Sequence, residues 1–198
     1  MASANFDLFS DAPDGATPTG FSYSPDFIGP DEEADLSAKI RRLDFAPYEF
    51  RGVQARRRVV SFGLRHGYSG KPVEQAEVIP HFLDKLRAKA AVFAGIAQDE
   101  FKQVLVSEYT PGTPIGWHRD RPIYDAVVGI SLLSEATFRF RLETERGWIR
   151  KFQHLEPRSI YLLRGPARYQ WQHSIPAVPA LRYSITFRTL REGDAQLA

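Results

Sequence analysis

Two hydrophobic periodicities meet near residue 100 of this chain. Before that point, residues 79–95 repeat apolar side chains at a helical spacing. Residues 30–42 start with a proline and acidic side chains and end with basic ones, as helices commonly do. After residue 100, short runs alternate apolar and polar side chains with the period of two that is typical of β-strands. The pattern predicts two helices followed by an all-β second half.

The predicted strands are short and are separated by turn residues. The run 126–133 is almost wholly apolar, as in a buried strand, whereas 137–141 alternates phenylalanine with arginine. Other strand-like runs lie at 21–28, between 45 and 70, and at 104–106, 159–163 and 181–189. Two helices outside two antiparallel sheets indicate an α+β fold that is mainly β, a jelly-roll barrel with supporting helices. The highly charged run 139–150 is predicted to be a solvated hairpin.

A length of 198 residues suits one domain with a sizeable core. Residues 1–20 are rich in Asp, Ala, Pro, Gly and Thr, and they are predicted to be a mobile N-terminal segment. Residues 21–100 are predicted to form an N-terminal extension with the helices, and residues 101–191 the barrel core. We expect the extension and the core to make one continuous domain.

Composition narrows the function classes. Apolar residues make up 43% of the chain, with 14 Phe and 8 Tyr, so an aromatic-rich interior is expected rather than disorder. The absence of cysteine excludes disulfides, thiolate metal sites and thiol nucleophiles, and a net charge of +2 creates no strong field for a polyanion. We find neither a secretory leader nor the roughly 20 consecutive apolar residues that a membrane-spanning helix needs. We expect a soluble, cytoplasmic monomer without a membrane partner.

His118, Asp120 and His173 are the strongest chemical signal. Because side chains alternate along a strand, His118 and Asp120 project to one side, while Trp117 and Arg119 project to the other. Two imidazoles and one carboxylate are the set that holds non-haem Fe(II) on one face and leaves the other face open. Zinc binds the same residue types, but the chain has no His-Glu-X-X-His helix. An isolated histidine is more often structural, so the order of the three residues carries the prediction.

Arg182 and Arg188 share one face of the strand expected at 181–188, together with Ser184 and Thr186. Two inward arginines are unfavourable unless an anion pairs with them, and a guanidinium matches a carboxylate with two parallel hydrogen bonds. The alternative is a solvent-facing strand with two free arginines. A position nine residues after His173 favours an anionic co-substrate beside the metal. A zinc hydrolase has no need of such a strand.

These motifs, in this order, resemble those of the AlkB-like Fe(II)/2-oxoglutarate dioxygenases. The matching segments are Ser107-Glu108-Tyr109-Thr110-Pro111-Gly112, His118-Arg119-Asp120, Trp171-Gln172-His173 and Arg182-Tyr183-Ser184-Ile185-Thr186-Phe187-Arg188. The resemblance covers about residues 57–190 and implies a double-stranded β-helix. It also implies Fe(II) as the metal, with 2-oxoglutarate and O2 as co-substrates.

The resemblance assigns roles to individual residues. It implies that His118, Asp120 and His173 hold the iron and form the catalytic centre. Four further residues would bind 2-oxoglutarate: Tyr109, Arg182 and Ser184 at the remote carboxylate, and Arg188 at the carboxylate near the metal. Ser107 stands where the family commonly has asparagine, so it is a weaker candidate for the same co-substrate.

The segment from Arg57 to Gly70 resembles the nucleotide-recognition lid of the same family. Arg56, Arg57 and Arg58 have guanidinium groups suited to phosphates, although a solvated strand edge explains such a run equally well. A methylated base would leave the stack to reach the metal. Our candidate substrate residues are Arg57, Arg58, His66, Tyr68, Trp117 and Tyr124.

The resemblance implies oxidative demethylation of alkylated bases in DNA or RNA, with release of formaldehyde, succinate and CO2. Family members that repair DNA often carry acidic residues directly after the His-X-Asp motif. Here the segment reads Arg121-Pro122-Ile123-Tyr124-Asp125, which is shorter and has one acidic residue. The alternatives are the same chemistry on a protein side chain or small molecule, and a non-catalytic nucleic-acid-binding module.

Overall fold

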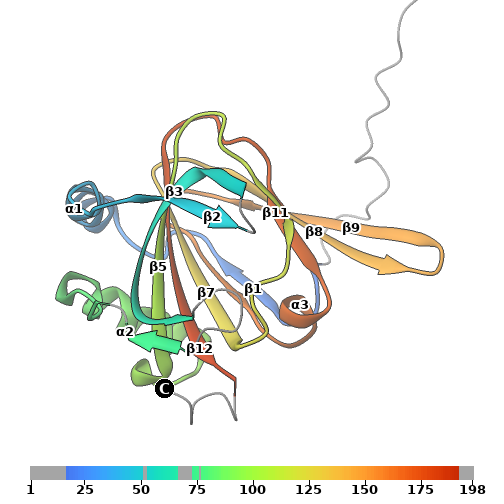
Figure 1. The fold of residues 1–198 in the computed structure, drawn as a ribbon, viewed down its shortest axis with the longest axis horizontal. Coiled ribbons are helices and arrows are strands. Elements are labelled where there is room, and N and C mark those ends of the chain that lie inside the picture. Colours follow the sequence, from blue (N-terminus) through green and yellow to red (C-terminus); the bar gives the residue numbers. More distant parts are fainter. Residues whose placement is uncertain (1–16, 51–52, 67–72, 76, 192–198) are drawn as a thin grey trace, which may run out of the picture.

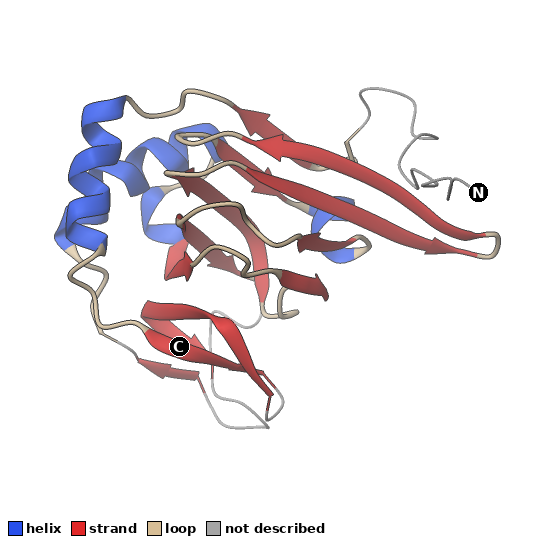
Figure 2. Ribbon diagram, turned by 90° about the horizontal axis from the view of Figure 1, so that it is seen from above, coloured by secondary structure: helices blue, strands red, loops and turns tan. Residues whose placement is uncertain are grey.

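The computed structural model describes residues 17–50, 53–66, 73–75 and 77–191. Its strands form two antiparallel sheets, and the two longer helices gather along one side of them (Figures 1 and 2). Side chains from both sheets meet in a shared core, as in a double-stranded β-helix. The mainly β, jelly-roll architecture predicted from the sequence is confirmed.

The larger sheet has the order β1-β10-β7-β12-β5-β3-β2, with β4 paired to β3. The strands are β1 (Phe21–Ser24), β2 (Ala46–Phe50), β3 (Val53–His66), β4 (Val73–Gln75), β5 (Phe101–Tyr109), β7 (Tyr124–Leu132), β10 (Ile160–Leu163) and β12 (Arg182–Leu190). The arginine-bearing strand β12 lies between β5 and β7 and pairs with both along its length. Its polar side chains are therefore held between two neighbouring strands.

The smaller sheet has the order β6-β11-β8-β9. It contains β6 (Ile115–His118), β8 (Ala136–Thr144), β9 (Gly147–Leu155) and β11 (Gln172–Ile175). Strands β8 and β9 form a long hairpin that extends beyond the rest of the barrel (Figure 1). The charged run 139–150 makes up most of this hairpin, and its tip is exposed, as predicted.

The helices are α1 (Pro30–Ile40), α2 (Asp84–Ala94) and the short α3 (Gly165–Tyr169), with 3-10 turns η1 (His81–Leu83) and η2 (Gln98–Glu100). Pro30 occupies the first turn of α1, where its missing N–H leaves no hydrogen bond unmade. Helix α2 begins at Asp84 rather than at residue 79, because Pro80 precedes a 3-10 turn. None of the described helices is long and apolar enough to cross a membrane.

Two hydrophobic cores follow from the alternation of side chains along β12. Tyr183, Ile185 and Phe187 point toward the helices and pack with α1 and α2. The even-numbered side chains point to the other face, between the two sheets, where Phe138 and Phe140 of β8 close the second core. Strand periodicity therefore sends the arginines of β12 into the space between the sheets.

Candidate metal and co-substrate site

The three candidate metal ligands meet on the inner side of the smaller sheet. His118 of β6 lies directly opposite His173 of β11 in the antiparallel register, and their ring centroids are 4.3 Å apart. Asp120 follows two residues after β6 ends, and its Oδ2 lies 3.9 Å from Nε2 of His173. One ligand atom from each residue lies within 4.8 Å of the other two. Such a cluster of two imidazoles and a carboxylate fits one divalent ion.

The orientation of His118 suits metal binding. Its Nδ1 lies 2.9 Å from the carbonyl oxygen of Gly116. Because a carbonyl only accepts, Nδ1 carries the proton and Nε2 keeps its lone pair. A hydrogen bond of this kind fixes both the tautomer and the plane of the ring.

The charge states of the three groups also match this role. Burial lowers the pKa of His118, and burial together with the neighbouring His118 lowers that of His173 to about 3. Burial alone would raise the pKa of Asp120, but the charges of Arg188, His173 and His118 outweigh it and hold that pKa well below its usual range. The site therefore offers two neutral imidazoles and one carboxylate, as a divalent cation requires.

Arg188 connects the metal ligands to the larger sheet. Its Nη2 donates to Oδ1 of Asp120 at 3.3 Å, and its Nη1 donates to Oε1 of Gln103 at 3.0 Å. The guanidinium carbon lies 5.1 Å from the centre of the Tyr124 ring. The described contacts thus place Arg188 beside the metal site, where the family resemblance implies a contact to a carboxylate of the co-substrate.

Arg182 is fully buried and only partly paired. Its Nε donates to Oγ of Ser131 at 2.9 Å, and its guanidinium lies 5.1 Å from the centre of the Tyr109 ring. Neither terminal nitrogen has a hydrogen-bond partner among the described residues. A buried guanidinium in this state is costly unless an anion completes its bonding. Arg182 and Tyr109 therefore fit a carboxylate such as that of 2-oxoglutarate.

Three serines form a row beside this arginine. Ser184 of β12 lies directly between Ser107 of β5 and Ser131 of β7 in the strand register, and all three are buried. Directly opposed residues point to the same face of a sheet. The row lines the space between the sheets with small hydroxyl groups, and Ser107 belongs to it even though asparagine is common there in the family.

Sequence reasoning missed three residues of this site. Ser131 accepts a hydrogen bond from Arg182, and Gln103 accepts one from Arg188. Burial raises the pKa of the Tyr161 phenol, and the nearby charge of Arg182 opposes this shift. The usable signal for Ser131 is a serine inside the largely apolar run 126–133, whereas Gln103 lies in a strand of mixed polarity and carries no such signal. Tyr161 carries no such signal, because it lies in the apolar strand β10 and packs against Phe138 as an aromatic core residue would.

The candidate substrate residues lie in different places. Arg57 is 8% exposed, and its charge acts on His118. Tyr124 is buried under Arg188. Arg58, the next residue on β3, forms an ion pair with Glu108 at 2.6 Å and lies over the Phe45 ring on the helix side. Of the two arginines, Arg57 is therefore the one directed to the metal site.

Trp117 is a correction to the predicted substrate pocket. Its ring contacts Arg139 and Arg141 on the outer face of the smaller sheet, because neighbouring residues of a strand point to opposite faces. The side chain of His66 and all of Tyr68 lie outside the described residues.

Arg168 of α3 holds the loop that follows the His-X-Asp segment. It is buried, and its Nη2 donates to the carbonyl oxygens of Arg121 and Tyr124. Its charge also acts on Asp120 and His173. Arg168 is therefore a positioning residue for the loop between Asp120 and β7.

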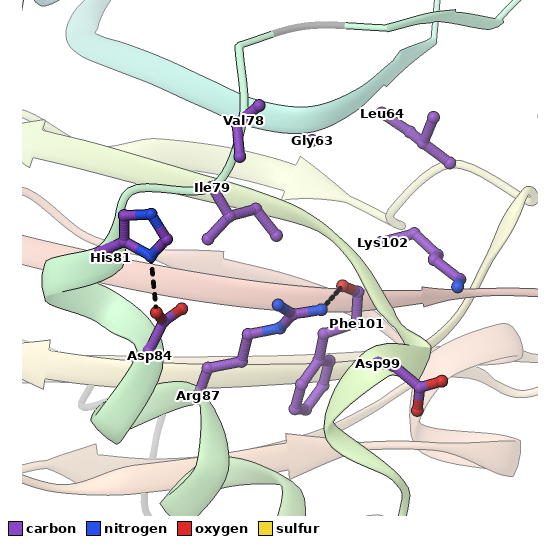
Figure 3. A pocket seen from close by; sticks show the side chains of 10 residues that line it. All are labelled: Gly63, Leu64, Val78, Ile79, His81, Asp84, Arg87, Asp99, Phe101 and Lys102. Carbon is purple, nitrogen blue, oxygen red and sulfur yellow. Dashed lines mark hydrogen bonds and ion pairs between the residues drawn. The ribbon is translucent and has the colours of Figure 1, made fainter.

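A separate recess of about 490 Å³ lies where the end of β3 meets the segment before α2 (Figure 3). Val78, Ile79 and Leu64 line one side of it, and Arg87 spans the floor by donating to the carbonyl oxygen of Phe101 at 2.7 Å. None of the metal or co-substrate residues lines this recess. The chemistry therefore belongs to the space between the sheets.

Comparison with known proteins identifies the class that this geometry defines. Residues 20–188 match the sequence profile of the 2OG-Fe(II) oxygenase superfamily, and the chain belongs to that superfamily. Within it, the chain is similar to AlkB homologues. It is 27% identical over 181 residues to the Arabidopsis thaliana alkylated DNA repair protein ALKBH8 homolog. It is 37% identical over 155 residues to the Bos taurus mitochondrial alpha-ketoglutarate-dependent dioxygenase alkB homolog 7.

The extent of these matches differs. The alignments include 79% and 76% of this chain but only 51% and 65% of those two relatives. An uncharacterized protein of Acanthamoeba polyphaga mimivirus is 30% identical, and its match includes 86% of this chain and 85% of the viral protein. The chain thus shares the oxygenase region with relatives of quite different total length.

Solved structures show the same fold at low sequence identity. OsALKBH1 superimposes with a TM-score of 0.67 at 18% identity, over 86% of this chain and 98% of the other. A Pseudomonas putida prolyl-4-hydroxylase gives a TM-score of 0.58 at 16% identity, over 88% and 94% of the two chains. These likenesses support the fold, and the ligand set supports the class: the protein is a 2-oxoglutarate-dependent Fe(II) dioxygenase.

Proposed function

We propose that this dioxygenase oxidatively demethylates alkylated bases in DNA or RNA, with release of formaldehyde, succinate and CO2. The observation that carries the proposal is the buried Arg57 beside the metal ligands. Its charge acts on His118, and its Nε has no hydrogen-bond partner among the described residues. A substrate that brings phosphate groups to the metal would complete the bonding of this cation. A relative named as an alkylated DNA repair protein supports the same direction.

The surroundings of Arg57 suit a flat ring next to a charge. Its guanidinium lies 4.2 Å from the centre of the Tyr48 ring, and the buried Tyr124, which interacts electrostatically with Tyr48, lies under Arg188. Aromatic faces of this kind stack on an extruded base while a cation meets its phosphate. The neighbouring Arg58 is occupied by Glu108 and does not take part.

The protein's own contribution is binding and orientation. His118, Asp120 and His173 would hold Fe(II), and Arg182 with Tyr109 would fix 2-oxoglutarate, so that the iron and its co-substrates supply the oxidising chemistry. Burial of Arg182, Ser184 and Ser131 keeps bulk water away from the co-substrate. Formation of the amine needs no side-chain base, because a hydroxylated N-methyl group loses formaldehyde unaided.

A turnover panel tests the proposal. The holoenzyme with Fe(II) and 2-oxoglutarate is given oligonucleotides with different N-methylated bases, and formaldehyde and the change in base mass are measured. We expect mass loss from at least one base, and we expect Arg57→Met to raise KM for that oligonucleotide. Arg56→Met is the matched control, because Arg56 is the adjacent but exposed arginine. Succinate formation without a change in any base would overturn the proposal.

A second candidate is the same oxidation on a protein side chain or small molecule. The acidic residue after the His-X-Asp motif favours it, because Asp125 is exposed and accepts a hydrogen bond from the Tyr169 hydroxyl at 2.6 Å. The Asp125 carboxylate thus binds Tyr169 at the surface, whereas a carboxylate that recognised a base would face the metal site. Release of succinate that depends on a methylated peptide or amine, and not on an oligonucleotide, would favour this candidate.

A further inference from the structure

The outer face of the smaller sheet carries a mixed aromatic and arginine surface. It comprises Trp117 of β6, Arg139 and Arg141 of β8, and Trp148, Arg150 and Phe152 of β9. The strand register aligns Arg139 with Phe152, Arg141 with Arg150 and Glu143 with Trp148, so these side chains share one face. Phe138 and Phe140 point the other way, toward His173 and the core. We call this set the outer arginine–tryptophan face.

Neutral side chains, and not carboxylates, accept the hydrogen bonds that hold Arg139 and Arg141 in place. Nε of Arg139 donates to Oγ of Ser174 at 3.1 Å, and Nε of Arg141 donates to Oε1 of Gln172 at 2.6 Å. In the part of the chain that the structure describes, no carboxylate forms an ion pair with Arg139, Arg141 or Arg150. Glu143 is the described carboxylate that alternation puts on the same face. The face therefore keeps a net positive charge.

The aromatic rings stand between these cations. The Arg141 guanidinium lies 4.6 Å from the Trp117 ring and 4.2 Å from the Trp148 ring, and that of Arg139 lies 5.1 Å from Trp117. Trp148 and Phe152 remain 36% and 46% exposed, which is unusual for such large apolar side chains. Exposed rings that alternate with unpaired arginines match the bases and phosphates of a single strand. A duplex fits less well, since its bases are already stacked.

We propose that the outer arginine–tryptophan face binds single-stranded nucleic acid next to the metal site. This inference rests on the proposed nucleic-acid substrate. Trp117 and His118 are neighbours on β6, and β6 is an edge strand of the smaller sheet. Trp117 faces outward while His118 faces the metal, so a strand that leaves the face at Trp117 passes this edge to reach the iron. The projecting β8–β9 hairpin lengthens the binding surface (Figure 2).

Binding measurements separate this face from the metal site. Fluorescence anisotropy is measured for the metal-loaded protein and an unmodified single-stranded oligonucleotide over a series of salt concentrations. The double change Trp148→Ala and Phe152→Ala should weaken binding by at least about fivefold. Arg150→Gln should reduce the slope of log K against log salt by about 0.7. Ile149→Ala, an equally exposed apolar residue on the other face of β9, and Lys85→Gln on α2 should change neither quantity.

Turnover of a short substrate distinguishes the possible failures. A methylated dinucleotide can reach the metal without covering the hairpin, so the double variant should process it at the wild-type rate while KM for a long methylated strand rises. If the wild type releases no formaldehyde from either substrate, the proposed function fails. If both substrates are processed and the variants bind the oligonucleotide as tightly as the wild type, the outer arginine–tryptophan face does not bind nucleic acid. A protein partner would then explain its exposed rings and arginines better.

Discussion

Arg188 and Asp120 form a buried ion pair that joins the larger sheet to a metal ligand. Nη2 of Arg188 lies 3.3 Å from Oδ1 of Asp120, and both side chains are largely buried. The pairing explains how the carboxylate stays ionised in a site where burial opposes its charge. The pair also couples the metal site to the stability of the fold, because a substitution at Arg188 changes both the charge beside Asp120 and the packing between the sheets.

Loss of this arginine should destabilise the metal-free protein. We expect Arg188→Met to lower the free energy of unfolding by about 3–5 kcal/mol, because it leaves a buried carboxylate without its cation. A divalent metal should recover part of the loss by supplying positive charge beside Asp120. Urea denaturation with and without Mn(II) measures both effects. Lys39→Met, which removes an exposed ion pair with Asp35, is the control and should lose less than about 1 kcal/mol.

Metal binding should depend on His173. Removal of one of three ligands by His173→Ala should abolish the stabilisation that divalent ions give to the wild type, which is about 2.7 kcal/mol at a metal concentration 100 times Kd. Thermal unfolding in a Mn(II) series measures it. His154→Ala is the matched control, because His154 lies exposed on β9 away from the ligand cluster. An equal loss in both variants would contradict the assigned ligand set.

Arg182 should trade stability against co-substrate binding. Its two terminal nitrogens are buried without partners, so Arg182→Met should leave the unliganded protein equally stable or more stable, by up to about 4 kcal/mol. The same change should raise KM for 2-oxoglutarate by roughly tenfold or more, since charged hydrogen bonds are lost. Denaturation and succinate assays give the two numbers. A variant that loses stability but keeps its KM would show that Arg182 is a structural residue.

Acid should destabilise the metal-free protein below neutral pH. His173 has a pKa of about 3 in the folded protein, against an ordinary value of 6.5 for an exposed imidazole. Between these values the unfolded state binds the extra proton, so the free energy of unfolding falls as the pH falls, by at most about 1.4 kcal/mol per pH unit for one proton. Burial of His118 acts in the same direction.

The slope of stability against pH tests this assignment. His173→Asn should flatten the dependence between pH 6.5 and 3, because the group that avoids protonation in the fold is gone. Val92→Ala should leave it unchanged, since Val92 is exposed and its side chain binds no proton. Denaturation curves at a series of pH values would contradict the prediction if both variants kept the wild-type slope.

Gly129 should not tolerate a larger residue. A Cβ at this position would overlap the ring of Tyr161, which is packed against Phe138. Gly129→Ala should therefore cost about 1–3 kcal/mol of stability. Combination with Tyr161→Leu should recover part of that loss as a coupling energy. Gly29→Ala, where nothing lies within 4 Å of the added carbon, should change stability by less than about 1 kcal/mol.

The sequence by itself predicted the fold class, the three residues that meet as candidate metal ligands, and the arginine strand. Strand alternation is a local property, and it placed Arg182, Ser184 and Arg188 on one face without any knowledge of the partners. The order of the His-X-Asp motif and the later histidine predicted that these three residues meet, although β6 ends at His118 and Asp120 lies beyond the strand. The charged hairpin was also readable, since a run of solvated side chains needs no tertiary contact.

Only the tertiary structure decided which residues stand around those side chains. Ser131 and Gln103 hold the two arginines from neighbouring strands, and the register that brings them there is set by pairing over long sequence distances. Alternation separates Arg57 from Arg58, and the pairing of β3 with β5 decides that Arg58 meets Glu108 while the charge of Arg57 acts on His118. Alternation already separated Trp117 from His118, and the packing of the two sheets decided that the face with Trp117 is the outer one. Sequence periodicity fixes which residues share a face, but only packing fixes what that face meets.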